Sequence, residues 1–173
     1  LLSHSKVVAT PHLGASTQEA QREVAIEAAE QVLAGLAGAP ARNTVNAPFL
    51  LPEVHAVLAP YIQVGLIVGK LLTHLAEGQF VGVTIRYEGE IAKHNTAMLK
   101  SAVLAGLLGP VTGDQVNLIN APFLAQQRGL SLTEQSNEAA AEYVSMITAT
   151  LDTTGGPITV AGTSMRDEAH VVK

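Results

Sequence analysis

The segment at residues 60–76 constrains the fold most, because nearly every face that it presents as a helix is apolar. Proline is tolerated in the first turn of a helix, so Pro60 is predicted to begin this one. The apolar side chains recur at helical spacing along one face and continue on the neighbouring faces: Tyr61, Val64, Val68, Leu71 and Leu75, then Ile62, Leu66 and Ile67. A helix that is apolar around most of its circumference is buried on several sides, in a core or against another subunit.

A sheet is the expected partner of this helix. Val81, Val83 and Ile85 alternate with small or polar residues at the two-residue period of a strand with one exposed face. The elements expected from such patterns are strands at residues 81–87, 116–119, 143–151, 158–161 and 169–172, a helix capped by Asn95 and a short helix from Pro122. We therefore predict an α/β fold of the α+β type, in which a mixed, largely antiparallel sheet is covered by helices mainly on one face.

The N-terminal residues follow a different pattern, with a short strand at 6–10, a loop and a helix at 17–36. Ser16 and Glu19 have the spacing of a capping box, and Gly38 and Pro40 end the helix. We therefore expect two domains, residues 1–44 and 45–173. Because the chain begins without Met and stops within a strand-like run, we expect both ends to be cut, the second domain at its C-terminus.

Composition argues against several functional classes. The net charge of −5 and pI near 5.6 give no basic surface for nucleic acid. The sequence has no cysteine, so it offers no disulfide, zinc–thiolate site or thiol nucleophile, and a cytoplasmic location is expected. The apolar stretch at residues 58–72 is interrupted and shorter than the roughly 20 residues that span a bilayer, so no membrane association is expected. His74 and Glu77 lack a third ligand nearby, and no metal site is expected.

One short repeat is present: VNAPFL at residues 45–50 recurs as INAPFL at residues 119–124. In each copy an asparagine followed by a proline is typical of the start of a helix, where the side chain accepts hydrogen bonds from free amides. Capping is the simpler interpretation of Asn120, and a role in binding an effector is the alternative.

Residues 9–17, with the sequence ATPHLGAST, carry the most specific pattern. They resemble the active-site histidine loop of the D-2-hydroxyacid dehydrogenases, and residues 18–21 (QEAQ) resemble the 3-phosphoglycerate branch of that family. The segments at 45–48 (VNAP), 116–122 (VNLINAP), 128–129 (RG) and 162–164 (GTS) resemble the intervening, or allosteric substrate-binding, domain of the longer phosphoglycerate dehydrogenases. The resemblance covers essentially the whole chain. It implies that residues 1–44 are the last part of a Rossmann-type catalytic domain.

The resemblance also implies a reaction, the NAD-dependent oxidation of D-3-phosphoglycerate to 3-phosphohydroxypyruvate in L-serine biosynthesis. His12 would be the general acid/base, since imidazole with a pKa of about 6.5 exchanges protons readily at neutral pH. Gly14 and Ala15 are small enough for the backbone to approach a cofactor carboxamide. No G-x-G-x-x-G fingerprint occurs, so the cofactor cradle, the orienting glutamate and the substrate arginine are expected upstream, and this chain alone is expected to be inactive.

Two alternatives belong to other functional classes. The chain could be a regulatory or oligomerisation domain that binds a small anionic effector, with Asn120 and Arg128 as candidate ligands, although residues 134–151 contain no Lys, Arg or His. It could also be the similar intervening domain of an iron–sulfur serine dehydratase, which the absence of cysteine does not support. We further expect a homo-oligomer, because Gly65 and Gly69 would let two copies of the apolar helix approach closely.

Overall fold

The computed structural model describes residues 4–36, 43, 45, 52–112, 115–139 and 142–173. The chain divides into two compact units, Leu1–Val45 and Asn46–Lys173. Each unit is described by itself. Apart from Val45, the first copy of the repeat lies outside the described residues.

The first unit contains the helix α1 (Gln18–Leu36), close to the predicted bounds. The backbone N–H of Ala20 donates to the Thr17 hydroxyl at 3.2 Å, so Thr17 is the capping residue. The capping box predicted for Ser16 and Glu19 is wrong, because the Ser16 hydroxyl instead donates to the Leu13 carbonyl at 2.9 Å. The strand predicted at residues 6–10 is not formed either. Val8 is 91% exposed, and among the described residues no strand pairs with this segment. Its backbone N–H and C=O groups therefore make no strand-to-strand hydrogen bonds there.

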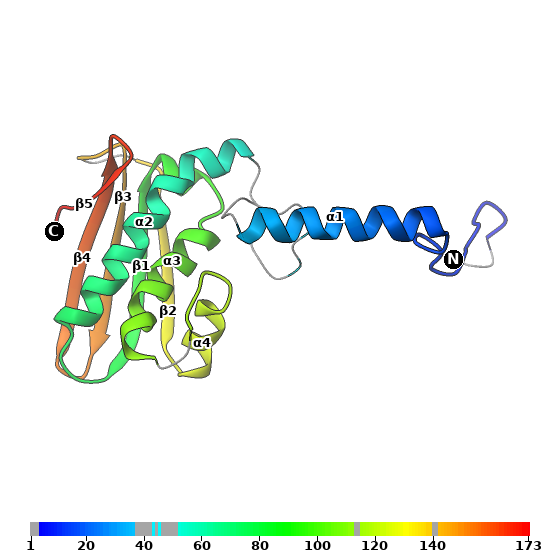
Figure 1. Cartoon of the computed structure of the whole chain (residues 1–173). Helices are drawn as coiled ribbons and strands as arrows, with labels where there is room; N and C mark the ends of the chain where they lie inside the picture. Colours follow the sequence, from blue (N-terminus) through cyan, green and yellow to red (C-terminus); the bar gives the residue numbers. More distant parts are fainter. Residues whose placement is uncertain (1–3, 37–42, 44, 46–51, 113–114, 140–141) are drawn as a thin grey trace. The chain divides into compact units, whose positions relative to one another are not determined.

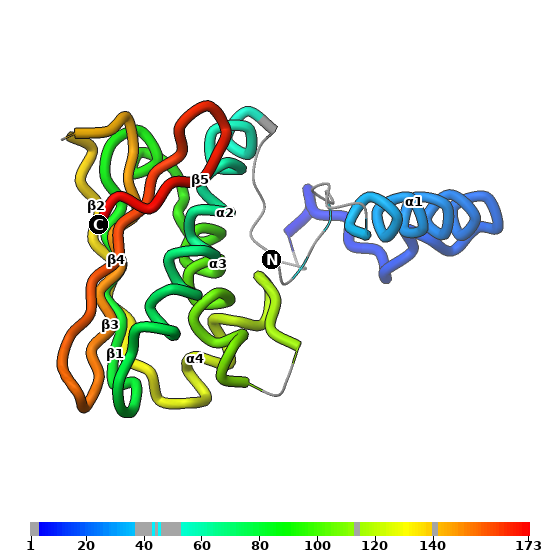
Figure 2. The backbone as a smooth tube through the Cα atoms, turned by 60° about the vertical axis from the view of Figure 1, so that its left-hand side comes forward, coloured from blue at the N-terminus to red at the C-terminus, as the bar shows by residue number. Residues whose placement is uncertain are grey.

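The second unit is a five-stranded sheet covered by helices on one face, as predicted (Figures 1 and 2). The strand order is β2 (Ser131–Asn137), β1 (Phe80–Gly89), β3 (Ser145–Thr153), β4 (Gly156–Met165) and β5 (Glu168–Val171). Only β1 and β2 are parallel to each other, and the remaining neighbours are antiparallel. The helical layer consists of α2 (Pro52–Leu75), α3 (Ala97–Leu108) and α4 (Ala121–Gln127), with short 3-10 turns at Glu90–Lys93 and Gly109–Val111.

The helix α2 begins at Pro52, so the prediction that Pro60 begins it is wrong. A proline inside a helix costs about 3 kcal/mol, because it removes one hydrogen bond and crowds the preceding turn. The two turns before Pro60 are held by packing, since Leu58 is fully buried and Val54 packs against the core. Among the described residues, Glu53–Leu75 is the one helix long and apolar enough to cross a membrane by length and composition alone. Its contacts with α3, β3, β4 and β5 account for this apolar character.

Glycines set the distance between α2 and α3. A Cβ at Gly69 would overlap the Val103 carbonyl, and one at Gly106 would overlap the Leu66 carbonyl. A Cβ at Gly65 would lie 3.0 Å from the Ala102 methyl group. These glycines therefore bring the two helices of one chain together. The prediction that Gly65 and Gly69 face a second subunit is wrong.

The strand predictions need three corrections. Val81 is 53% exposed rather than buried, because the register with β3 shifts between Phe80 and Gly82, and the expected alternation holds only from Val83 onward. Residues 116–119 form no strand, since asparagine side chains occupy the local backbone groups, as described below. The strand β2 was not predicted at all. All seven of its residues are exposed, so it has no alternation of apolar and polar residues to reveal it.

Candidate functional site

The histidine loop of the first unit is a short exposed turn directly before α1. The Leu13 carbonyl accepts hydrogen bonds from the Ser16 backbone N–H at 3.2 Å and from the Ser16 hydroxyl at 2.9 Å. Gly14 and Ala15 are the two central residues of this turn, and a Cβ at Gly14 would meet no atom within 4 Å. His12 precedes the turn and is exposed. The loop thus presents an imidazole next to a small, open stretch of backbone.

No other described residue donates to or accepts from the His12 side chain. A general acid/base needs a partner that orients its ring and a substrate held within hydrogen-bond distance. Among the described residues, no hydrogen bond fixes the orientation of the His12 ring.

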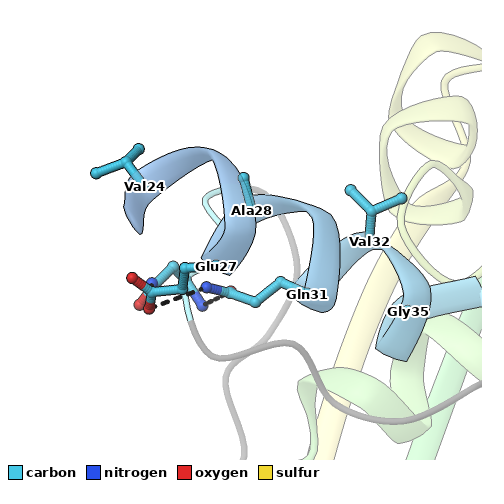
Figure 3. A pocket seen from close by; sticks show the side chains of 7 residues that line it. Val24, Glu27, Ala28, Gln31, Val32 and Gly35 are labelled. Atoms are coloured by element: carbon cyan, nitrogen blue, oxygen red, sulfur yellow. Dashed lines mark hydrogen bonds between the residues drawn. The ribbon is translucent and has the colours of Figure 1, made fainter. Parts of the chain in front are cut away.

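The helix behind this loop carries an open apolar groove of about 450 Å³, shown in Figure 3. Val24, Ala28, Val32 and Gly35 line it along one stripe of α1. On its polar side the backbone N–H of Asn43 donates to the Gln31 side chain at 2.8 Å, and the Asn43 amide donates to Glu27 at 3.3 Å. None of the α1 residues is buried. The groove has the character of a packing surface rather than of a reaction site.

In the second unit, Arg128 lies on a groove of about 370 Å³ at one end of the sheet. The wall is mainly apolar, and its lining residues are Gly78, Gln79, Phe80, Leu108, Val111, Arg128 and Leu130. Arg128 ends α4, and its backbone N–H donates to the Leu124 carbonyl at 3.1 Å. Among the described residues it forms no ion pair, so its guanidinium is the one positive charge available to an anion in this groove.

Asn120 lies at the other end of α4, but its side chain makes no capping hydrogen bond to this helix and is engaged in a turn, so the capping interpretation is wrong. Its side-chain oxygen accepts from the Asn117 backbone N–H at 2.8 Å, and its amide donates to the Gln115 carbonyl at 2.8 Å. Asn117 in turn accepts from the backbone N–H groups of Ile119 and Asn120. With a rise of about 1.5 Å per helical residue, α4 separates Asn120 from Arg128 by about 12 Å. The structure therefore does not bring these two candidate ligands together.

A polar network that the sequence patterns did not predict connects β1, β2 and α3, in which Tyr87 is buried and Lys100 and Glu134 are partly exposed. The Tyr87 hydroxyl donates to Glu134 at 3.2 Å, and the Lys100 ammonium lies 2.9 Å from the other oxygen of this carboxylate. Burial, and then the negative charge of Glu134, raise the pKa of Tyr87 above its ordinary value. The phenol therefore stays protonated and serves as a donor. Predicting the network required knowing that β2 exists, and this strand has no alternation of apolar and polar residues to reveal it.

Comparisons with known proteins agree with these features. Residues 57–172 match the model of the D-3-phosphoglycerate dehydrogenase intervening domain. The chain belongs to this family. It is 36% identical to the D-3-phosphoglycerate dehydrogenase of Bacillus subtilis over 94% of this chain and 31% of that protein. It is 31% identical to the enzyme of that name from Archaeoglobus fulgidus over 100% of this chain and 33% of that protein. It is also 41% identical to the chloroplastic D-3-phosphoglycerate dehydrogenase 2 of Arabidopsis thaliana, over 78% of this chain and 22% of that protein.

The matches differ in what they cover. The intervening-domain match falls within the second unit, whereas the Archaeoglobus match extends over the whole chain, including the histidine loop. The chain spans between 22% and 33% of the length of these three dehydrogenases.

Proposed function

We propose that this chain is part of an NAD-dependent D-3-phosphoglycerate dehydrogenase that forms 3-phosphohydroxypyruvate for L-serine biosynthesis in the cytoplasm. The observation that carries the proposal is the presence, in one chain, of the exposed histidine loop and the family's intervening domain. An alignment that covers 100% of this chain and 33% of a D-3-phosphoglycerate dehydrogenase supports the interpretation of the two units as parts of one enzyme. The iron–sulfur serine dehydratase alternative has no such support.

His12 is the proposed general acid/base. NAD, when bound, accepts the hydride that leaves C2 of the substrate together with the electrons of the C2–H bond. His12 takes the proton of the C2 hydroxyl as the carbonyl forms, and it returns a proton in the reverse reaction. The open backbone at Gly14 leaves room for the nicotinamide end of the cofactor. The glycine-rich cradle for the pyrophosphate is absent from this sequence, so NAD is expected to bind tightly only in the longer protein.

The test uses the full-length enzyme. His12→Asn is expected to lower kcat by about 10²- to 10⁴-fold with the KM for NAD nearly unchanged, the usual range for the loss of a general acid/base. His74→Asn, an exposed histidine of α2, is the matched control and should keep normal turnover. A kcat of the His12→Asn enzyme equal to that of the wild type would remove His12 from the mechanism.

The Arg128 groove favours a second, regulatory function for the intervening domain. Its volume suits a small molecule, and its single guanidinium among apolar walls suits an anion that also has an apolar part. Calorimetric titration of this chain with 3-phosphoglycerate and with L-serine tests this. Binding that is abolished by Arg128→Gln and kept by Lys93→Gln would support an effector site here. Binding unaffected by Arg128→Gln would place any such site elsewhere.

A further inference from the structure

Ser16 is the residue between the histidine loop and the capping residue of α1, and its side chain serves the loop rather than the helix. Its hydroxyl donates to the Leu13 carbonyl at 2.9 Å, and Thr17 supplies the cap of α1 instead. The Ser16 backbone N–H donates to the same carbonyl at 3.2 Å. One carbonyl, placed one residue after His12, therefore receives both of the donors that Ser16 possesses.

These two hydrogen bonds act on a turn that packing does not support. Every residue at 4–19 is exposed, and Leu13 itself is 55% exposed, so no buried side chain of this segment fixes its backbone. Gly14, at the second position of the turn, adds conformational freedom because it has no Cβ. Among the described residues, the Ser16 hydroxyl therefore supplies one of the two hydrogen bonds that close the turn.

The closed turn decides how the chemical groups of the loop are presented. His12 comes directly before Leu13, and Gly14 and Ala15 are the two central residues. The bonds that close the turn use the first and the fourth residue, and among the described residues neither the Gly14 nor the Ala15 N–H donates to a backbone carbonyl. Opening of the turn therefore changes the backbone direction at the imidazole and at these two amides together.

The turn is attached to a rigid element through the neighbouring residue. The Thr17 hydroxyl accepts from the Ala20 N–H at 3.2 Å, and the Gln21 N–H donates to the Thr17 carbonyl at 3.0 Å. Groups supported by a helix or strand hold their position more precisely than groups on a free loop. The Ser16 hydroxyl thus joins the carbonyl that follows His12 to the start of the 19-residue helix α1.

We propose that Ser16 is a positioning residue for the reaction: its hydroxyl holds the turn in the conformation from which His12 exchanges a proton with the substrate. Acid/base catalysis requires the imidazole within hydrogen-bond distance of the hydroxyl that loses its proton, and a displacement of about 1 Å lowers the rate steeply. Ser16 acts through His12 and not on the reacting atoms. This inference rests on the proposed role of His12 and adds a second residue to that site.

Steady-state kinetics of the full-length enzyme tests this role. Ser16→Ala is expected to lower kcat about three- to tenfold, the range for the loss of one hydrogen bond, and to change the KM for NAD by less than about twofold. Ser16→Thr keeps the hydroxyl and should restore kcat. Thr17→Ala is the matched control, because it removes the hydroxyl of the next residue and weakens the start of α1 more, yet leaves both bonds to Leu13 in place. Its kcat should exceed that of the Ser16→Ala enzyme.

A double-mutant cycle measures whether Ser16 acts through His12. In the His12→Asn enzyme, Ser16→Ala should have no further effect on the residual turnover, because the group that Ser16 positions is already gone. The same loss on both backgrounds, a greater loss in Thr17→Ala, or a wild-type kcat of Ser16→Ala beside an impaired His12→Asn enzyme would overturn the role of Ser16 alone. Unimpaired turnover of the His12→Asn enzyme would overturn the catalytic proposal and the role of Ser16 with it.

Discussion

The helices α1 and α3 differ in composition as well as in surroundings, because eight of the 19 residues of α1 are Glu, Gln or Arg, whereas Lys100 and Ser101 are the two polar residues of α3. None of the 19 residues of α1 is buried, whereas nine of the 12 residues of α3 are buried, and α3 packs against α2 and α4. The sequence motif that indicates chemistry precedes the exposed helix, and the intervening domain has a complete core of its own. The most specific motif therefore lies in the unit whose described helix has no buried residue.

The largest expected effect comes from adding one methyl group, as a Gly→Ala substitution, to a helix of each unit. Gly69→Ala would overlap the Val103 carbonyl and force α2 and α3 apart, lowering the free energy of unfolding by about 3 kcal/mol. In Gly35→Ala, the added methyl group meets no atom within 4 Å. This substitution should instead stabilise the helix α1, by about 0.5–1 kcal/mol. Denaturant unfolding followed by circular dichroism compares the two. Equal stability of the Gly69→Ala and wild-type chains would show that the close approach of the two helices is not required.

A smaller effect tests the buried Tyr87 of the second unit at alkaline pH. Because the pKa of Tyr87 is raised in the folded state, the folded chain keeps a proton that the unfolded chain releases above about pH 10. This contribution to stability is present below that pH and is lost as the pH rises. In the wild type, the free energy of unfolding should fall by up to about 1.4 kcal/mol per pH unit above about pH 10 because of this proton. Tyr87→Phe should abolish that part of the pH dependence.

Urea unfolding at about pH 9 and pH 11 measures this difference, with Tyr143→Phe as the control. The same alkaline loss in the Tyr87→Phe chain and in the wild type would contradict a role for the Tyr87 proton.

The smallest expected effect concerns the start of α1. Thr17→Ala removes the side-chain oxygen that binds the Ala20 amide and should destabilise the first turn by about 1 kcal/mol. Ser16→Ala, which removes only a hydrogen bond to Leu13, should affect the helix less. Exchange rates of the first helical amides compare the two variants. A larger effect of Ser16→Ala would restore the capping box predicted from sequence.

Sequence patterns predicted the elements in which the spacing of apolar residues indicates the buried face. The apolar circumference of α2 and the alternation of Val83 and Ile85 each reflect contact with the core, and both elements formed, although α2 begins two turns before the predicted Pro60. Patterns failed where hydrogen bonds decide the structure. Residues 116–119 look like a strand but are turned by Asn117 and Asn120, and β2 looks like a loop although it completes the sheet.

The candidate site divides in the same way. His12 was found through a resemblance in consecutive residues, which needs no tertiary structure. The Glu134–Lys100 pair joins residues from β2 and α3, and Arg128 acquires its apolar groove only when β1, α3 and α4 come together. Such sites depend on long-range contacts that residue spacing does not record.

The parallel pairing of β1 with β2 also has a consequence for the order of folding. The β3–β4 hairpin closes through a short turn, whereas Ser131 reaches Gly82 only after the chain has passed through α3 and α4. Contacts between residues distant in sequence carry a higher loop-closure cost and tend to form late. We therefore expect β2 to be the last strand to join the sheet and the first to detach.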